Sequence, residues 1–193
     1  MIRTIRGRSV SDLERKKGSS GLTLRDFSAL PRFGLKGINL QAWLKTNRYH
    51  AGEESNQAYP QDDGCLAARL SPRELLFLCD PERPVLSADH DYFNPARNCY
   101  MIRRQDSHYW FAICGNKGPS MLAKLCGVNF DPIDYDNHRV AQTRVAATSA
   151  IVVRNDSRKS LCYYLLGDNS YVSYMKSCLR DAMAEFGGRA TEQ

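Results

Sequence analysis

The 193-residue sequence predicts an α+β fold made of two similar halves, each a strand, a glycine turn, a helix, a loop and a β-hairpin, forming antiparallel sheet with packed helices. The first observation behind this prediction is an internal repeat of sequence, which we call the echo. PRFGLKGINLQAWL at residues 31–44 is matched 81 positions later by AICGNKGPSMLAKL at residues 112–125, with five of fourteen positions identical. The second observation is that a loop and a hairpin pattern follow both copies in the same order, with one more helix closing the second half.

The first half opens with a short strand near residues 32–36 that enters a helix near residues 38–47. Leu40, Trp43 and Leu44 recur there at the spacing of one helical face. Residues 46–64 are polar and rich in turn formers, which predicts a long loop.

The hairpin of the first half is predicted at residues 65–81. Their sequence, CLAARLSPRELLFLCDP, has two strand-like runs separated by the turn residues SPRE. Three prolines make residues 81–98 a second irregular stretch.

The second half repeats this order. SHYWFAICG at residues 107–115 is rich in β-favouring residues, and Pro119 suits the first position of a helix over residues 119–126. Residues 131–139 form a loop, and TRVAATSAIVVRND and SLCYYLLGD then form a hairpin around residues 155–159.

A final helix is predicted over residues 171–186, with one apolar face. Ser170 is the expected N-cap, and Gly187-Gly188 is the expected stop. The apolar face consists of Val172, Met175, Leu179, Ala182 and Phe186.

The basic charge of the chain is concentrated at its start. The net charge is +6, and residues 1–20 contribute +4 of it, from six bases and two acids. This segment lacks the apolar content to fold alone, so residues 1–21 are predicted to be a basic flexible tail. The remainder, residues 22–193, is predicted to be a single domain with halves at about 22–98 and 99–193. A nucleic-acid-binding arm is the alternative for the tail, but it has no interleaved aromatic residues to stack on bases.

No apolar run approaches the roughly 20 residues that a membrane helix needs. The N-terminal residues MIRTIRGRSV also lack the apolar core of a secretory signal. We therefore expect a cytoplasmic protein.

The seven cysteines are predicted to be buried free thiols. Their number is odd and no two are close enough for a CxxC motif. Four of them lie inside apolar runs, where cysteine behaves as a small hydrophobic residue. The cysteines are at positions 65, 79, 99, 114, 126, 162 and 178.

The repeated Lys-Gly of the echo is not a Walker loop, because its lysine precedes the second glycine and no hydroxyl residue follows. A helix N-terminus could still hold an anion. Two copies at matching positions favour a structural role, a sharp turn from strand to helix.

No residue pattern specifies a catalytic, cofactor-binding or metal site, and we expect none on this chain. His50, His90, His108 and His138 show no ligand spacing. DPIDYD at residues 131–136 has three carboxylates but not the calcium-loop pattern, which favours a solvated loop.

An ordered set of motifs runs along the chain. In the second half these are QDSHYWFAICGNKGPSMLAKLCGVNFDP, VAQTRVAATSAIVVRND and YYLLGDNSYVSYMKSCLRDAMAEFGG, and in the first half they are PRFGLKG and ARLSPRELLFL. Taken together, this set resembles the gamma subunit of heterotetrameric sarcosine oxidase, and the resemblance covers roughly residues 25–188.

The resemblance implies a shortened version of the folate-binding domain of glycine-cleavage-type aminomethyltransferases. It implies a structural subunit that docks directly on an alpha subunit, with beta and delta subunits in the same complex. FAD, FMN, NAD, tetrahydrofolate and zinc are expected on those partners, and no cofactor on this chain. Such a complex demethylates sarcosine, passes the one-carbon unit to tetrahydrofolate and passes electrons to oxygen.

Three alternatives to this function stay open. One is the similar subunit of an N-methylglutamate dehydrogenase complex. Another is a free-standing folate-binding protein of the aminomethyltransferase type. The third is a nucleic-acid-binding module that works through residues 1–20 and binds in a strongly salt-dependent way.

Overall fold

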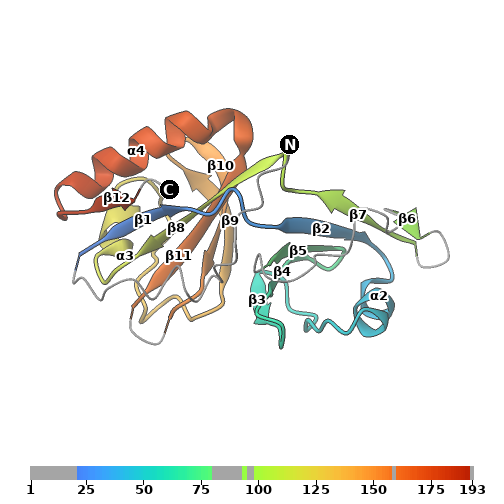
Figure 1. The fold of residues 1–193 in the computed structure, drawn as a ribbon. Helices are drawn as coiled ribbons and strands as arrows, with labels where there is room; N and C mark the ends of the chain where they lie inside the picture. Colours follow the sequence, from blue (N-terminus) through green and yellow to red (C-terminus); the bar gives the residue numbers. More distant parts are fainter. Residues whose placement is uncertain (1–20, 80–92, 95–97, 158–159, 192–193) are drawn as a thin grey trace.

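The computed structural model describes residues 21–79, 93–94, 98–157 and 160–191. The backbone of these residues has an α+β architecture with two six-stranded sheets (Figure 1). The predicted tail falls outside the described residues except for Gly21. No helix in the described part of the chain is long and apolar enough to cross a membrane.

The first sheet, sheet A, has the strand order β12-β1-β8-β11-β10-β9. Its neighbouring strands are antiparallel apart from β12, which runs parallel to β1. Its strands are β1 (Thr23–Asp26), β8 (His108–Cys114), β9 (Val140–Val145), β10 (Thr148–Arg154), β11 (Cys162–Asp168) and β12 (Arg189–Thr191).

The second sheet, sheet B, has the order β3-β4-β5-β2-β7-β6 and is antiparallel throughout. Its strands are β2 (Arg32–Gly37), β3 (Gln57–Pro60), β4 (Leu66–Ser71), β5 (Glu74–Leu78), β6 (Phe93–Asn94) and β7 (Cys99–Arg103). The helices are α2 (Leu40–Thr46), α3 (Gly118–Leu122) and α4 (Val172–Ala184), with a 3-10 turn, η2 (Asn169–Tyr171), before α4.

The two sheets share one arrangement of strands. In each, the strand that precedes a helix (β2 or β8) lies between the last strand of the following hairpin (β5 or β11) and a strand from elsewhere in the chain (β7 or β1). β1 pairs in sheet A but leads into β2 of sheet B, and β7 pairs in sheet B but leads into β8 of sheet A. The chain therefore crosses between the sheets at residues 27–31 and again at residues 104–107.

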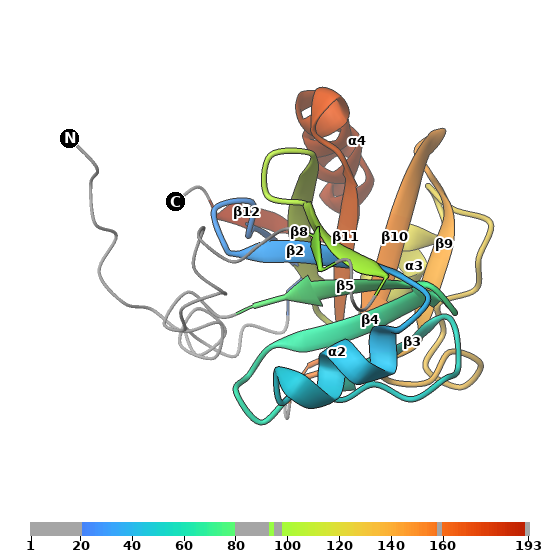
Figure 2. The ribbon, with the colours of Figure 1, turned by 90° about the vertical axis from the view of Figure 1, so that its right-hand side faces the viewer.

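The elements form four layers around three apolar cores. Met175 belongs to the core between sheet A and α4, and Trp110 and Leu76 belong to the core between the two sheets. Trp43 and Phe77 belong to the core between sheet B and α2. Figure 2 shows the strands of sheet A crossing those of sheet B steeply, so the sandwich is of the orthogonal kind.

The edge strands of the two sheets meet at β3 and β9. The Ala58 amide donates to the His138 carbonyl at 2.7 Å, and the Val140 amide donates to the Asn56 carbonyl at 2.9 Å. The Gln142 side chain also donates to the Leu70 carbonyl of sheet B. Neither edge strand is therefore left open to another chain along this seam.

The predicted final helix is present, and its stop is confirmed. The Gly187 amide donates to the Ala184 carbonyl, and the Gly188 amide donates to the Met183 carbonyl, which together form a Schellman motif. The predicted N-cap at Ser170 is wrong, because it is the Asp168 carboxylate that accepts from the Ser170 amide and caps η2.

Short elements account for the other differences from the prediction. The predicted loop at 46–64 contains β3. No local sequence pattern predicts that this strand pairs with β4. The predicted helix at 119–126 ends at Leu122, and the short strands β1, β7 and β12 were not predicted. The irregular stretch predicted at 81–98 falls mostly outside the described residues.

TRVAATSAIVVRND is not one strand but two, joined by a tight turn. Val145 pairs with Thr148, so the loop of the β9–β10 hairpin is Ala146-Ala147. Both alanines have positive φ, 45° and 65°, as a type I′ turn requires. The sequence hides this turn because the usual Asn-Gly is replaced by residues that rarely adopt this conformation.

Candidate functional site at the crossover of the sheets

The polar centre of the molecule lies where the two crossover segments, residues 27–31 and 104–107, pass each other. We call this region the crossover junction. The Phe27 amide donates to the Trp110 carbonyl, and the Trp110 amide donates to the Ser28 hydroxyl, so the first segment is held against β8. The Asn169 side chain donates to the Asp106 carbonyl and holds the second segment.

Arg32 joins the two segments through backbone carbonyls. Its side chain donates to Ser28 and Leu30 on one segment, at 3.0 and 2.8 Å. It donates to Gln105 on the other segment at 2.7 Å and to His108 at the start of β8. The residue is only 3% exposed, and burial lowers the pKa of its guanidinium. All these acceptors are main-chain groups, so Arg32 acts as a structural clamp.

A second arginine, Arg104, lies across the inner face of sheet B. Its guanidinium donates to Glu74 at 2.5 Å, and Lys36 reaches the same carboxylate at 3.6 Å. A Cβ atom on Gly34 would come within 3.1 Å of Arg104 Nε, so a glycine leaves the room that this side chain occupies. Within the described residues, Nε itself has no hydrogen-bond acceptor.

His108 connects this charged group to the crossover. Arg104 can only donate, so the 3.3 Å contact makes Nε2 of His108 an acceptor. Nδ1 of the neutral ring then carries the proton and donates to the Ser107 hydroxyl at 2.8 Å. That hydroxyl in turn donates to the Arg103 carbonyl. Burial, with the positive charge of Arg104, lowers the pKa of His108 and keeps the ring neutral.

This arrangement excludes a nucleophilic Ser-His pair. A serine nucleophile needs to donate its proton to the imidazole, whereas Ser107 accepts from the ring and donates to a carbonyl. The group therefore orders the turn before β8. The S-H dipeptide was part of the family resemblance, but nothing in the sequence revealed Arg32, Arg104 and Glu74 as its neighbours.

The other histidines lie apart from the junction along the chain. His138 is at the seam between β3 and β9, where burial lowers the pKa of its ring. His50 is exposed in the segment after α2, and His90 lies outside the described residues. In the described ranges, no group of three or more His, Cys, Asp or Glu side chains could hold a metal ion.

Two carboxylates of the acidic loop DPIDYD accept hydrogen bonds, one from the loop's own backbone and one from a neighbouring side chain. Asp131 accepts from the Ile133 amide, and Asp134 accepts from the Asn129 side chain. The Arg154 guanidinium donates to the Pro132 and Tyr135 carbonyls of the same loop. The loop is a self-ordered surface element.

The two Lys-Gly segments do contain strand-to-helix joints, but in a different register from the echo. Gly37 ends β2 with φ 154°, and Gly115 follows β8 with φ 138°. At Gly37 a Cβ atom would clash with the Asn98 carbonyl oxygen, 2.2 Å away, and at Gly115 it would lie tightly against Leu22 Cα, 3.0 Å away. The matching residues are therefore Gly37 and Gly115, whereas the echo paired Gly34 with Gly115.

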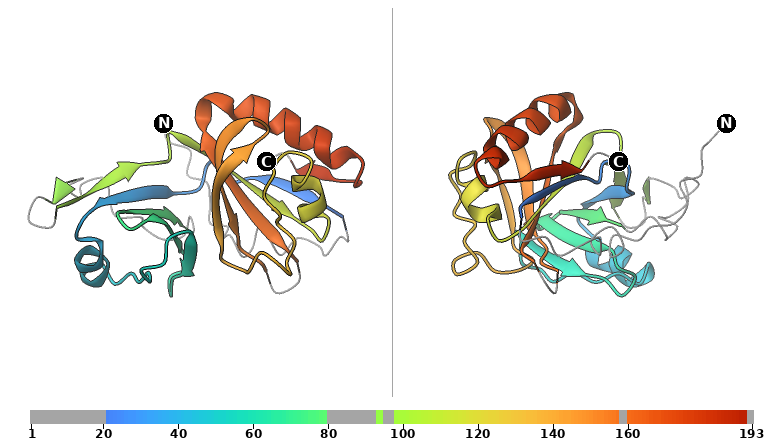
Figure 3. Two further views of the ribbon diagram at one scale, coloured as in Figure 1. Left: turned by 180° about the vertical axis from the view of Figure 1, so that it is seen from behind. Right: turned by 60° about the vertical axis from the view of Figure 1, so that its left-hand side comes forward.

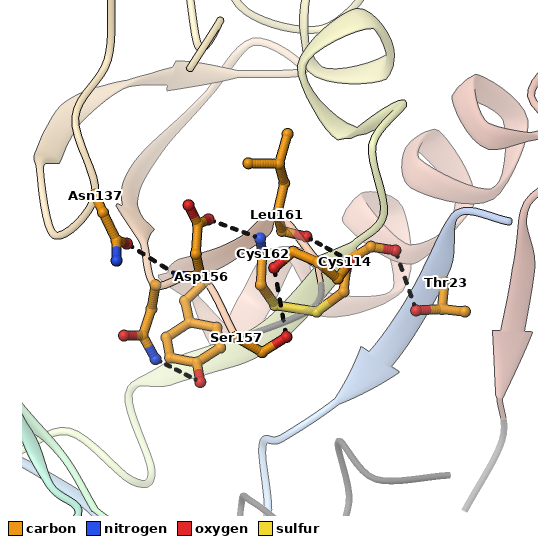
Figure 4. The surroundings of a disulfide bond; sticks show 10 residues. Thr23, Cys114, Asn137, Asp156, Ser157, Leu161 and Cys162 are labelled. Atoms are coloured by element: carbon orange, nitrogen blue, oxygen red, sulfur yellow. Dashed lines mark hydrogen bonds between the residues drawn. A yellow bond between two sulfur atoms is a disulfide. The ribbon is translucent and has the colours of Figure 1, made fainter. Parts of the chain in front are cut away.

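Cys114 and Cys162 form a disulfide between β8 and β11 (Figure 4). The prediction of free thiols is wrong for these two residues, because antiparallel pairing sets them directly opposite each other with Cα atoms 4.1 Å apart. The Cys162 amide donates to Asp156, and the Thr23 hydroxyl donates to the Cys114 carbonyl. Spacing along the sequence, 48 residues, gave no indication of this contact. The other five cysteines form no disulfide bond.

Comparison with solved structures gives two close likenesses in fold. A chain of heterotetrameric sarcosine oxidase from Corynebacterium sp. U-96, in complex with pyrrole 2-carboxylate, superposes with a TM-score of 0.72 at 17% identity. The match covers 91% of this chain and 90% of that one. Glycine cleavage system aminomethyltransferase T from Bartonella henselae superposes with a TM-score of 0.65 at 12% identity. That match covers 89% of this chain but 48% of the other, so this chain spans about half of the aminomethyltransferase.

No protein-family model and no curated protein matches the sequence. The fold is therefore identified by structural similarity and not by similarity of sequence. It is the fold common to the sarcosine oxidase chain and to aminomethyltransferase T, and the resemblance expected from the motifs is confirmed at that level.

Proposed function

We propose that this chain is a non-catalytic structural subunit of a heterotetrameric, flavin-dependent oxidase or dehydrogenase of sarcosine or a related N-methyl amine. The observation that carries the proposal is the mutual coverage with the sarcosine oxidase chain, nine-tenths of both chains. A free-standing aminomethyltransferase is less well supported, because this chain spans only about half of such an enzyme.

The crossover junction supports a structural role. Arg32 binds main-chain carbonyls, and the ring nitrogens of His108 are both occupied by neighbouring side chains. These are groups that order a fold, and none is poised to transfer a proton to a substrate. The shared strand order of the sheets also supports two halves, about residues 22–98 and 99–193, within one domain.

In the proposed complex, this chain docks on the alpha subunit beside beta and delta subunits. FAD, FMN, NAD, tetrahydrofolate and zinc are held by those partners. The complex removes the N-methyl group and passes the one-carbon unit to tetrahydrofolate.

The test is to purify the tagged full-length chain from its own cells and identify what accompanies it. The expected result is a yellow complex with three further chains that oxidises sarcosine or N-methylglutamate. Assaying both amines separates the two types of complex. A colourless, stable monomer would overturn the proposal.

Calorimetry of the isolated chain with tetrahydrofolate tests the free-standing alternative. We expect no heat of binding. Saturable binding would favour the aminomethyltransferase-type protein instead.

A further inference from the structure

The disulfide occupies the last residue pair of the β8–β11 ladder. Cys114 lies opposite Cys162, one residue before the strand-to-helix joint at Gly115. The Gly115 amide donates to the Leu161 carbonyl at 2.9 Å. The main-chain hydrogen bonds at this end of the ladder therefore belong to the Gly115–Leu161 pair, and the two cysteines form a non-hydrogen-bonded pair. The S–S bond can open without removing a main-chain hydrogen bond between β8 and β11.

Sheet B has the same joint without a covalent bond. Gly37, the counterpart of Gly115, donates its amide to the Arg73 carbonyl at 3.0 Å, and the pair before it is Lys36 opposite Glu74. Their side chains form an ion pair at 3.6 Å, with Lys36 48% exposed, and a pair so open to water contributes little stability. The fold therefore shapes this joint in sheet B without a cross-link, and the disulfide of sheet A is an addition to it.

Strand pairing also makes the disulfide easier to reduce than an unconstrained one. Directly opposite residues of a non-hydrogen-bonded pair lie about 4.5 Å apart between Cα atoms, whereas disulfides prefer about 5.5–6 Å. The Cα atoms of Cys114 and Cys162 are 4.1 Å apart, and a departure from the preferred separation favours reduction. Cys114 is half-buried and Cys162 is 1% exposed, so Cys114 is the residue that an attacking thiolate reaches.

The S–S bond ties the turn before β11 to the joint before α3 (Figure 4). On the β11 side, the Cys162 amide donates to Asp156 at 3.1 Å, and the Cys162 carbonyl accepts from the Asn155 amide at 2.8 Å. On the β8 side, the Cys114 carbonyl accepts from the Thr23 hydroxyl at 3.2 Å. Opening the S–S bond uncouples these two segments and leaves each with its own hydrogen bonds.

We propose that the Cys114–Cys162 disulfide is a redox switch that a dithiol reductant opens in the folded protein. A thiolate of the reductant attacks the Cys114 sulfur, and the Cys162 sulfur leaves as a thiolate and takes up a proton. The second thiol of the reductant attacks the mixed disulfide, releases Cys114 as a thiol and closes the reductant's own disulfide. Two electrons and two protons pass from the reductant to the protein.

The sequence supports this reading of the bond. It predicts a cytoplasmic protein, and disulfides in that compartment are usually transient, catalytic or redox-sensing. The switch is a property of this chain alone and does not depend on the proposed function.

The first test measures reduction of the native full-length chain, with dithiothreitol as the dithiol probe. Free thiols are alkylated at intervals and assigned by mass spectrometry. Cys114 and Cys162 should become reactive while circular dichroism stays that of the folded chain, and oxidised glutathione should close the bond again. Because no unfolding is needed, sub-denaturing urea should raise the rate less than twofold. Reduction that tracks the unfolded fraction, or seven thiols after treatment with oxidised glutathione, would overturn the switch.

The second test asks whether the S–S bond controls local structure. Native-state hydrogen exchange followed by NMR should be at least tenfold faster at the Gly115 and Cys162 amides in the reduced chain. The Gly37 amide is the matched control and should stay within twofold, since α2 and α3, which follow the two joints, lie at opposite ends of the molecule (Figure 3). Equal exchange at Gly115 and Cys162 in both states would show that the bond switches nothing.

Two variants separate the bond from general effects of the reductant. The double variant Cys114→Ser, Cys162→Ser should show the fast exchange of the reduced chain in every redox buffer. Cys178→Ser, at a cysteine outside the disulfide, should respond as the wild type does. A double variant whose exchange at Gly115 still changes with the redox buffer would contradict the proposal.

Discussion

The N–H groups of the buried arginines donate mainly to backbone carbonyls. Arg32 and Arg69 are each 3% exposed, and each donates to main-chain carbonyls. Arg154 adds a carboxylate, Asp156, at 2.6 Å. Burying a cation is costly unless its donors are satisfied, and carbonyl oxygens serve that purpose at the two crossover segments and at the acidic loop.

At the residue scale, the histidines make stability depend on pH. The folded-state pKa values of His108 and His138 are lowered below 6.5, so the unfolded chain binds these protons more readily. The contribution of these histidines to stability should therefore be constant above pH 7.5 and fall as the pH drops through 6.5. One histidine can contribute a slope of at most about 1.4 kcal/mol per pH unit. Urea unfolding at pH 8 and pH 5.5 measures the difference, and His108→Gln should reduce it.

Burial opposes ionisation of Asp26, but hydrogen bonds from Lys176 and Ser28 outweigh it and lower the pKa of Asp26 below 3.8. Its contribution is lost only as the pH falls through that range, outside the window measured. Equal pH dependence in His108→Gln and wild type would contradict the prediction.

The structural roles of individual side chains were the features least predictable from the sequence. A glycine that ends a strand is recognisable, and the joints at Gly37 and Gly115 were anticipated as a class. The clamp formed by Arg32 depends on carbonyls 73 and 76 residues away, and no local pattern encodes such contacts.

At the element scale, the backbone of the β9–β10 turn is strained, and a substitution in the turn can relieve the strain. An alanine in the left-handed region costs about 1 kcal/mol relative to glycine, and Ala146 and Ala147 both occupy it. Replacing the pair by Asn-Gly should raise the free energy of unfolding by about 1 kcal/mol, measured by urea denaturation. The bond from Tyr174 to the residue 146 carbonyl is retained, because it uses the backbone.

Gly187→Ala is the converse control. Gly187 has φ 64° at the end of α4, and a Cβ atom there would meet open space. Any loss of stability, expected to be about 1 kcal/mol, is then a backbone effect alone. A stabilised Gly187→Ala variant, or a destabilised Asn-Gly turn, would show that these conformations are not strained.

Periodic elements were predictable where side-chain burial repeats along the chain. The apolar face of α4 and the β4–β5 hairpin follow directly from their patterns. β3 and β7 are short, and their positions depend on distant partners, so local propensity carried little signal for them.

At the scale of the whole molecule, the disulfide links two neighbouring central strands of sheet A across 48 residues. Cross-links over loops of this length typically contribute about 2–4 kcal/mol by restricting the unfolded chain. The double variant Cys114→Ser, Cys162→Ser should lose stability of that order. Cys178→Ser, at a free cysteine outside the core, should not.

Thiol titration checks the same bond chemically. The denatured chain should show five thiols before reduction, out of seven cysteines in the sequence. Seven thiols in protein purified without reductant would contradict the disulfide.

The strand exchange between the sheets has a consequence for synthesis on the ribosome. β1 leaves the exit tunnel early, yet Thr23 finds its partner in β8 only 91 residues later. Sheet B likewise lacks β7 beside β2 until the second half has begun to emerge. Neither sheet can be completed from one half of the nascent chain, so the first half must stay unfinished, with an exposed strand edge, while the second is translated. Until β7 and β8 emerge, the unpaired edges of β2 and β1 can pair with strands of other chains, so the half-made chain is the form most prone to aggregate.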